Sequence, residues 1–334
     1  MNEITYREEL MQKIREVSPE RFEALSLEVF RYQAANNPVY RRYLNLLGAS
    51  PGHISKVREI PFLPISLFKK HLLQTGEWQP ERVFSSSGTT GSTASRHALR
   101  DPEWYRQQAR AAFAHFYGPV EAYCVLALLP SYLERQGSSL VFMAEDFIRQ
   151  SHYPGSGFFL YNTKALLESI HQCRKNGIPV LLLGVSFALL DLAEQHPTDL
   201  SGCIIMETGG MKGRRRELTR EELHAELKTA FGASHIHSEY GMTELLSQAY
   251  SQGQGAFRPA PAMQVLCREV TDPLSIRPPG KSGALNIIDL ANLDTISFIA
   301  TDDLGRVLPG GGFEVLGRLD DSDMRGCNLM VADL

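Results

Sequence analysis

From about residue 97 onward, short continuous apolar runs alternate with helix-period segments, and this alternation constrains the fold more than any other feature of the sequence. Runs of this kind occupy residues 123–129, 158–161, 178–183 and 204–206, and turn residues bound them. Strands that are apolar on both faces are typical of parallel sheets covered by helices on both sides. The pattern therefore predicts an α/β fold in which functional loops follow the carboxyl ends of the strands.

The regions before and after this part follow other patterns. Residues 1–80 hold helix-period stretches followed by several prolines, which predicts helices and then an extended segment at 60–64. After residue 255, prolines punctuate short strand-like runs, which predicts a small antiparallel β subdomain or barrel. The sequence thus predicts a helical N-terminal segment packed on the main domain, an α/β core, a β-rich subdomain and a C-terminal tail, at 1–80, 81–255, 256–316 and 317–334.

The composition of the chain limits its class and its partners. Its 334 residues are 43% hydrophobic and 22% charged, so the chain can bury a large core in two or three packed units. The formal net charge of −4 gives no reason to expect nucleic acid or an anionic membrane as a partner. Five widely spaced cysteines favour reduced thiols. No signal peptide is recognisable and no run approaches the roughly 20 apolar residues that span a bilayer, so we expect a cytoplasmic protein.

A stretch of glycine and small hydroxyl residues follows the apolar pair Val83-Phe84. It consists of Ser85, Ser86, Ser87, Gly88, Thr89, Thr90 and Gly91. Such a loop concentrates backbone N–H groups and hydroxyl donors, and its glycines permit close approach, which is the chemistry of a loop that wraps phosphate oxygens. A polar surface loop is the alternative, because glycine-rich strings are weakly specific.

Two predicted strands run into polar residues at their carboxyl ends. Residues 204–206 lead into Glu207-Thr208-Gly209-Gly210, and residues 234–238 lead into Glu239-Tyr240-Gly241-Met242-Thr243-Glu244. In the second motif an aromatic ring could stack on a base, a glycine could admit a backbone close to a ligand, a hydroxyl could contact a phosphate and a carboxylate could hold Mg²⁺. The alternative is a strand-to-helix turn in which Thr243 or Glu244 caps a helix and Tyr240 lies in the core.

Two further motifs lie in and after the predicted β-rich part. The first, Thr301-Asp302-Asp303-Leu304-Gly305, follows a predicted strand at 297–300, where paired acids could equally begin a turn. The second is Gly317-Arg318-Leu319-Asp320-Asp321, and Arg325-Gly326-Cys327 comes shortly after it. The order of these motifs along the chain is more informative than any one of them.

In this order, on an α/β chain, the motifs resemble those of the acyl-adenylate-forming enzymes. This superfamily includes acyl-CoA ligases, the adenylation domains of peptide synthetases and firefly luciferase. The resemblance covers roughly residues 80–327. It implies the large domain of that superfamily, in which parallel α/β subdomains are joined to a small antiparallel β subdomain, and it implies ATP and Mg²⁺ as cofactors.

The resemblance also implies a role for each motif. The hydroxyl-rich loop at 85–91 would hold the β- and γ-phosphates of ATP, Thr243 would contact phosphate and Glu244 would bind Mg²⁺. Tyr240 would stack on adenine. Other implied ATP- or AMP-binding residues are Gly209, Gly210 and Gly241 near adenine, Asp303 at the ribose hydroxyls and Arg318 on the ribose and phosphate side. His235 and His237, beside the tyrosine motif, could line the acyl or adenylate pocket.

The sequence departs from the superfamily pattern in two places. The phosphate loop continues as Ser92-Thr93-Ala94-Ser95-Arg96 instead of Pro-Lys-Gly, so Arg96 could replace the usual lysine. The implied hinge to a small C-terminal domain lies at Asp320, close to the end of this sequence, so we expect that domain to be absent or vestigial. One branch is similarly short, namely the acyl-protein synthetases associated with bacterial luciferase. The chain resembles that branch in length, in Leu129–Arg135 and in Arg325-Gly326-Cys327-Asn328-Leu329.

This closer resemblance makes Cys327 a candidate acyl acceptor. In that branch a fatty acid is activated with ATP and passed through a cysteine near the C-terminus to a partner reductase. A thiolate can attack an acyl-AMP and expel AMP, which leaves a thioester. The implied catalytic residues are therefore Thr243, Glu244 and Cys327, and the implied partners are a carboxylic acid, with a fatty acid favoured, and an acyl-accepting protein such as an acyl reductase.

Two alternatives stay open at this point. A relative of the acyl- or aryl-CoA ligases would use CoA directly and would not need Cys327. A non-catalytic nucleotide-binding subunit of a complex would bind ATP without consuming it, which would raise its melting temperature. The sequence leaves the identity of the acid, the acyl acceptor and the oligomeric state open.

Overall fold

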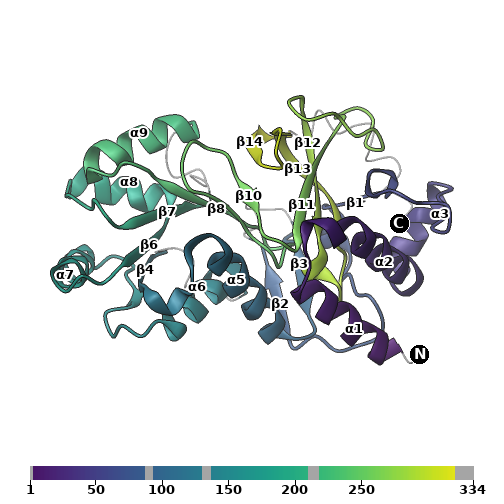
Figure 1. Cartoon of the computed structure of the whole chain (residues 1–334), viewed down its shortest axis with the longest axis horizontal. Helices are drawn as coiled ribbons and strands as arrows, with labels where there is room; N and C mark the ends of the chain where they lie inside the picture. The colour runs from purple at the N-terminus through teal and green to yellow at the C-terminus, as the bar shows by residue number, and fades with distance from the viewer. Residues whose placement is uncertain (1–2, 87–92, 130–136, 210–217, 320–334) are drawn as a thin grey trace. The chain divides into compact units, whose positions relative to one another are not determined.

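The structure of the chain is a computed structural model that describes residues 3–86, 93–129, 137–209 and 218–319 (Figure 1). The chain divides into two compact units. Unit 1 comprises Met1–Gln108, Thr243–Ser247 and Arg258–Leu334, and unit 2 comprises Ala109–Met242 and Gln248–Phe257. The helical N-terminal region and the β-rich C-terminal region therefore belong to the same unit.

A five-stranded sheet forms the centre of unit 1. Its strands are β1 (Leu63–Pro64), β11 (Met263–Arg268), β12 (Ser282–Asp289), β13 (Phe298–Val307) and β14 (Phe313–Arg318). Their order is β1-β13-β12-β11, with β14 also paired to β13. All pairs are antiparallel except β1 with β13. The antiparallel sheet predicted after residue 255 is thus present, and the extended segment predicted at 60–64 supplies β1.

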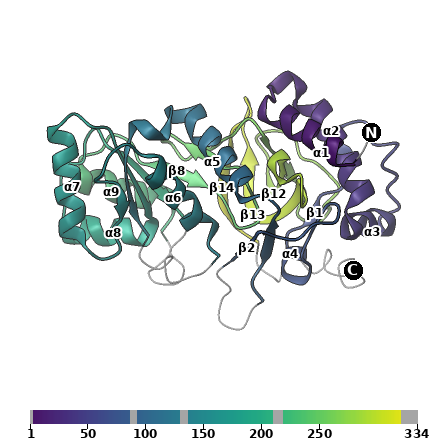
Figure 2. The same ribbon diagram turned by 90° about the horizontal axis from the view of Figure 1, so that it is seen from below.

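Three N-terminal helices pack beside this sheet, as Figure 2 shows for α1 and α2. They are α1 (Glu3–Arg15), α2 (Pro19–Asn36) and α3 (Pro38–Leu46). Phe30 of α2 lies edge-on to Phe298 of β13, with ring centroids 5.9 Å apart. Pro19 and Pro38 begin their helices, where the missing N–H of proline costs nothing. Burial of aromatic rings between helices and sheet forms the core of this unit.

The shorter elements of unit 1 include the hairpin that holds the hydroxyl-rich loop. Strand β2 (Arg82–Ser85) pairs antiparallel with β3 (Arg96–Leu99), and the loop connects them. The other short elements are η1 (Val57–Glu59), α4 (Leu67–Lys70), β10 (Arg258–Pro259) and η3 (Leu290–Asn292). Helix α5 (Pro102–Tyr117) begins in unit 1 and ends in unit 2.

Unit 2 is built on a largely parallel sheet, as the alternating sequence pattern predicts. Its strands run in the order β9-β8-β7-β6-β4-β5, and only β9 is antiparallel to its neighbour. They are β4 (Cys124–Leu128), β5 (Gly157–Phe158), β6 (Val180–Val185), β7 (Ile204–Thr208), β8 (His237–Tyr240) and β9 (Ala249–Ser251). Every residue of β4 and β6 is buried.

Helices cover both faces of this sheet. Figure 1 shows α8 (Ser186–Gln195) and α9 (Arg220–Phe231) on one face and α5 and α6 (Ser139–Gln150) on the other. The remaining helices of the unit are η2 (Val120–Ala122) and α7 (Thr163–Lys175). A capping box formed by Thr219 and Glu222 begins α9. Asn162 caps α7, because its side chain accepts the hydrogen bond from the Ala165 amide.

No described helix combines the length and the apolar character that a membrane crossing needs.

Candidate functional site

Two hydrogen bonds close the base of the hydroxyl-rich loop in unit 1. The Ser86 amide donates to the Ser95 carbonyl at 3.1 Å, and the Ser95 amide donates to the Ser86 hydroxyl at 2.9 Å. Ser85 and Ser86 thus extend β2 into the loop. The loop residues Ser87, Gly88, Thr89, Thr90 and Gly91 lie outside the described residues. The phosphate-binding role of the loop stays a prediction.

The first residues after the loop reach the motif that contains Glu244. Ser95 and His97 are two positions apart in an extended segment, so their side chains share one face. The Ser95 side chain forms a hydrogen bond with the Glu244 carboxylate, and His97 Nδ1 lies 2.8 Å from the Thr243 carbonyl oxygen. Arg96 is exposed. The hairpin of the hydroxyl-rich loop and the Thr243-Glu244 pair are therefore joined directly within unit 1.

Glu244 is a buried carboxylate. It is 6% exposed, and burial raises its pKa above the ordinary value, while the Ser95 hydrogen bond and the charge of Arg318 act in the opposite direction. Its backbone carbonyl accepts a 2.8 Å hydrogen bond from Asn292 Nδ2. The chain continues through turns and bends into β9, so the alternative in which Thr243 or Glu244 caps a helix is wrong.

Asp303 and Arg318 face each other on the neighbouring strands β13 and β14. They are directly paired in the antiparallel register, and Arg318 Nε lies 3.5 Å from Asp303 Oδ1. Both charges act on the pKa of Glu244, with Arg318 lowering it and Asp303 raising it. The alternative in which Asp302 and Asp303 begin a turn is wrong, because β13 runs through both residues to Val307. Pairing with β14 keeps this part of the chain extended.

The Glu244 carboxylate and the Ser95 hydroxyl that contacts it are oxygen ligands of the kind that Mg²⁺ accepts. The described residues contain no group of three or more His, Cys, Asp or Glu side chains that could hold a metal ion. Mg²⁺, however, is commonly bound through one or two carboxylates and completes its shell with water and substrate phosphates. A carboxylate whose pKa burial raises is stabilised in its charged form by a nearby cation. Glu244 is the residue that would hold the ion.

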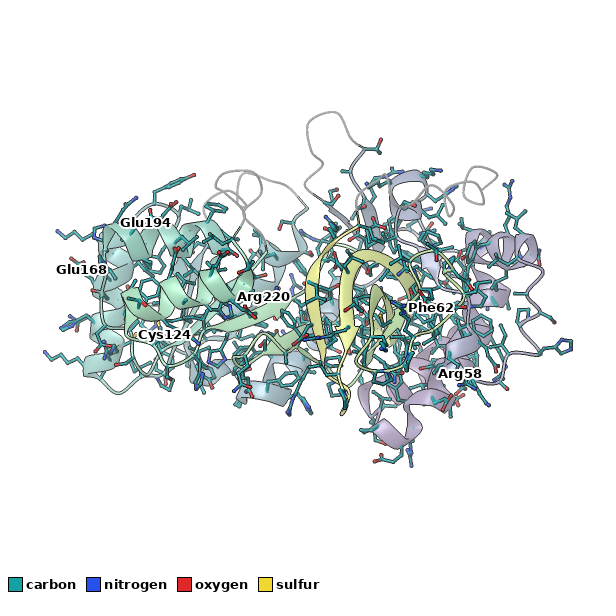
Figure 3. The ribbon with its side chains drawn as sticks, turned by 90° about the horizontal axis from the view of Figure 1, so that it is seen from above. Arg58, Phe62, Cys124, Glu168, Glu194 and Arg220 are labelled. Atoms are coloured by element: carbon teal, nitrogen blue, oxygen red, sulfur yellow. The ribbon has the colours of Figure 1, made fainter. Side chains whose placement is uncertain are left out.

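The predicted adenine-binding residues that the structure describes lie in unit 2. Tyr240 ends β8 and is partly exposed, and its ring lies 5.7 Å from that of Phe257. The guanidinium of Arg220, which Figure 3 labels at the start of α9, lies 4.7 Å from the centre of the same Phe257 ring. These contacts pack the two rings and the guanidinium against one another. The adenine-stacking role of Tyr240 stays a prediction.

The structure explains why glycine occupies positions 209 and 241 of unit 2. Gly209 follows β7 with a φ of 70°, a left-handed conformation that favours glycine, and its carbonyl accepts a 2.8 Å hydrogen bond from the Ser186 hydroxyl. A Cβ atom on Gly241 would clash with the Glu239 carboxyl group. Gly210 lies outside the described residues. The adenine-contacting roles of all three glycines stay predictions.

Two buried acids, Glu207 in β7 and Glu239 in β8, belong to the strand-end motifs but have no predicted role. The Thr208 hydroxyl donates to Glu239 Oε2, and burial raises the pKa of Glu239 to about 7, with the charge of Glu207 adding to the rise. Burial also acts to raise the pKa of Glu207, but the hydrogen bond from His224 and the charge of Arg220 outweigh it and lower that pKa. Two neighbouring carboxyl groups therefore differ in their ease of ionisation.

The two histidines before Tyr240 differ in their surroundings. Burial lowers the pKa of His237 to about 4, and its Nδ1 lies 3.1 Å from the Tyr117 hydroxyl. His235 is exposed. The suggestion that they line an acyl or adenylate pocket stays a prediction.

The structure thus groups the predicted residues in two sets. Unit 1 brings together the loop base, Thr243, Glu244, Asp303 and Arg318, and unit 2 holds Gly209, Tyr240 and Gly241. The sequence analysis predicts no supporting role for the residues that hold these groups in place, namely Ser95, His97, Thr208, Glu239 and Asn292. Cys327 lies outside the described residues.

No protein-family model matches the sequence, and no curated protein matches it. Solved structures match in fold. The ATP-bound structure of MatB from Rhodopseudomonas palustris aligns over 71% of this chain and 47% of its own, with 15% identity and a TM-score of 0.54. This chain therefore spans about half the length of that protein.

Two further solved structures have a similar fold. An open conformation of 2-hydroxyisobutyryl-CoA ligase in complex with 2-HIB-AMP and CoA aligns over 90% of this chain and 70% of its own, with 14% identity and a TM-score of 0.65. A double mutant of o-succinylbenzoate CoA synthetase from Bacillus subtilis aligns over 72% of this chain and 49% of its own, with 17% identity and a TM-score of 0.52. The chain has the fold of the large domain of the adenylate-forming enzymes.

Proposed function

We propose that this protein activates a carboxylic acid with ATP to form an acyl-AMP, and that the acyl group then passes to a thiol. The observation that carries the proposal is the environment of Glu244 in unit 1. This buried carboxylate is hydrogen-bonded by Ser95 at the base of a hydroxyl-rich loop, and the charges of Asp303 and Arg318 act on it. The proposal gives the loop the task of binding phosphate, Glu244 that of binding the metal and Asp303 that of binding the ribose hydroxyls.

The proposed reaction is an in-line displacement. A carboxylate oxygen of the acid attacks the α-phosphorus of ATP, the bond from that phosphorus to the bridging oxygen breaks, and pyrophosphate leaves with the electron pair. Mg²⁺, when bound, neutralises charge on the triphosphate. The loop donors and Thr243 hold the phosphates, Glu244 holds the metal, and Arg318 offsets charge on the ribose side. Asp303 accepts hydrogen bonds from the ribose hydroxyls, and Tyr240 with Gly209, Gly210 and Gly241 binds adenine.

CoA is the first candidate for the acyl acceptor. One of the solved structures with a similar fold, which aligns over 90% of this chain, is a CoA ligase in complex with 2-HIB-AMP and CoA. The CoA thiolate would attack the carbonyl carbon of the acyl-AMP, forming a thioester and releasing AMP. The similarity in fold to this CoA ligase favours CoA as the acyl acceptor, and the argument rests on the fold alone.

Cys327 is the second candidate acceptor, and the sequence motif at 325–329 supports it. Here the thiolate of the chain itself would expel AMP, and a partner protein such as an acyl reductase would take the acyl group from the thioester. A fatty acid would then be the substrate class.

Exchange of labelled pyrophosphate into ATP tests the activation step. We expect exchange with at least one member of a panel of fatty, hydroxy and aryl acids, dependent on Mg²⁺. Absence of exchange with every acid, in folded protein whose melting temperature rises with ATP, would instead favour a nucleotide-binding subunit.

The acceptor is tested separately. AMP release that depends on CoA and persists in Cys327→Ser supports CoA as the acceptor. A hydroxylamine-labile acyl adduct that mass spectrometry finds on Cys327, and that is lost in Cys327→Ser but retained in Cys203→Ser, supports the protein thiol.

A further inference from the structure

His97 is fully buried in β3, and both of its ring nitrogens are engaged. Nδ1 lies 2.8 Å from the Thr243 carbonyl oxygen, and Nε2 lies 3.0 Å from the Thr295 hydroxyl oxygen. The ring also lies edge-on to Phe68, with centroids 5.4 Å apart. All of these residues belong to unit 1. The imidazole therefore links the strand that follows the phosphate loop to the backbone of Thr243.

The partners of His97 fix its tautomer. A carbonyl oxygen only accepts, so Nδ1 carries the proton and donates to Thr243. Nε2 then accepts from the Thr295 hydroxyl. Burial lowers the pKa of His97 to about 4, so the ring is neutral at physiological pH. Because Nε2 accepts from the Thr295 hydroxyl, the proton stays on Nδ1, which donates to the Thr243 carbonyl oxygen.

The rest of the Thr243–Ser247 segment is held from a different part of unit 1. Asp289 accepts from the amides of Leu246 and Ser247 at 2.8 and 2.9 Å and from the Ser247 hydroxyl at 2.6 Å. Asn292 Nδ2 donates to the Glu244 carbonyl oxygen. Each of these anchors comes from the end of β12 or from η3. His97 and Ser95 instead come from the hairpin that carries the phosphate loop.

We propose that His97 is a positioning residue that sets the Thr243-Glu244 pair at a fixed place relative to the base of the phosphate loop. This inference rests on the proposed function, because it gives the pair its task of holding phosphate and metal. The Nδ1–H donor fixes the Thr243 backbone, and Ser95, on the same face of the chain, aims the Glu244 carboxylate. A shift of either segment alone breaks one of these bonds, so the two segments hold the triphosphate as one rigid body.

Two substitutions separate this role from simple packing of a buried ring. In His97→Asn the side-chain amide nitrogen takes the place of Nδ1 and keeps the donor to Thr243. In His97→Gln the longer side chain places its amide near Nε2, toward Thr295, and the donor to Thr243 is lost. Both remove the ring contact with Phe68, so both lower the melting temperature. Phe68→Leu is the matched packing control, because it disturbs the ring contact and leaves both hydrogen bonds.

Pyrophosphate exchange at saturating acid measures the positioning role. We expect His97→Gln to lower kcat/KM for Mg·ATP roughly tenfold, the size that follows from losing one aligned hydrogen bond, and His97→Asn to recover most of it. Phe68→Leu lowers the melting temperature without this kinetic loss. Equal losses in the Asn and Gln variants, tracking their melting temperatures, would overturn the proposal.

Amide hydrogen exchange gives a readout that does not depend on activity. In the protein without nucleotide, peptides covering residues 242–248 exchange faster in His97→Gln than in His97→Asn, and peptides of β11 are unchanged in both. If the wild-type chain fails to catalyse pyrophosphate exchange, the proposed function is wrong, and the hydrogen-exchange comparison alone then decides whether His97 positions the segment. Identical exchange of 242–248 in the two variants would refute that role.

Discussion

Asp303 and Arg318 stand opposite each other across β13 and β14, yet the acid is mostly buried and the base is mostly exposed. Their side chains are 14% and 71% exposed, with Arg318 Nε 3.5 Å from Asp303 Oδ1. An ion pair with one solvated partner contributes little to stability. The exposed guanidinium is therefore available to a ligand while it remains beside Asp303.

Arg318→Ala tests whether this pair serves binding instead of stability. We expect the free energy of unfolding to change by less than about 1 kcal/mol, because the guanidinium is largely solvated. The KM for ATP in pyrophosphate exchange rises, since a cation on the ribose and phosphate side is lost. Arg306→Ala is the matched control, because Arg306 pairs with Glu314 across the same two strands. The same rise in KM in both variants would refute a specific role for Arg318.

Glu239 should make stability depend on pH. Burial raises its pKa from 4.5 to about 7, so the folded state binds a proton that the unfolded state has already released between these values. This extra proton contributes roughly 3 kcal/mol to the free energy of unfolding. The contribution is fully present below pH 4.5 and is lost as the pH rises through 7.

Urea unfolding of the wild type and Glu239→Gln between pH 5 and pH 8 measures this effect. We expect the difference in stability between the two proteins to change in favour of the variant as the pH rises, because the amide cannot ionise. A difference that stays constant over this range would mean that Glu239 is already ionised at pH 5. Comparison with the variant removes the contributions of His97 and His237, which titrate in both proteins.

The lack of a side chain at Gly241 is linked to the carboxyl group of Glu239. Gly241→Ala places a methyl group against that carboxyl group and should destabilise the fold by about 1–3 kcal/mol. In the double variant Glu239→Ala/Gly241→Ala the carboxyl group is absent, so the alanine at position 241 should destabilise the fold less. A thermodynamic cycle from urea unfolding measures this coupling. Gly52→Ala, in open space, is the control, and strict additivity of the first two changes would contradict the linkage.

Glu244→Gln should separate stability from activity. Burial raises the pKa of this carboxylate, so replacing it with a neutral amide of the same shape leaves the metal-free protein equally stable or more stable by about 1 kcal/mol. The same change should abolish Mg²⁺-dependent pyrophosphate exchange. Thermal unfolding in EDTA and exchange assays over a Mg²⁺ series test both statements, with Glu269→Gln on the surface as the control. Full exchange activity in Glu244→Gln would remove it from the metal site.

Much of the fold follows from the sequence because it depends on local pattern. The apolar runs at β4, β6 and β7 are typical of buried parallel strands, and the structure pairs all three in parallel. The turn alternative at Asp302-Asp303 fails because pairing with β14 holds these residues extended, and that pairing is not visible in the local sequence.

The supporting residues of the candidate site could not be predicted from the sequence. His97 lies between Arg96 and Ala98 in a short strand, without any motif around it. Asp289 and Asn292 end a β-strand and form a short helix, where such residues are common as caps. Their importance comes from contacts with residues far away in the chain, and a single sequence contains no record of those contacts.

The anchoring of Thr243–Ser247 also orders events in folding. His97 lies 146 positions before its partner Thr243. Asp289 lies 43 positions after its partner Leu246, and Asn292 lies 48 positions after its partner Glu244. Contacts of such separation form late, since long stretches of chain must be brought together first. During synthesis, the segment that carries Glu244 leaves the ribosome after His97 but before Asp289 and Asn292. Glu244 therefore reaches its final position only after the chain has been made as far as Asn292.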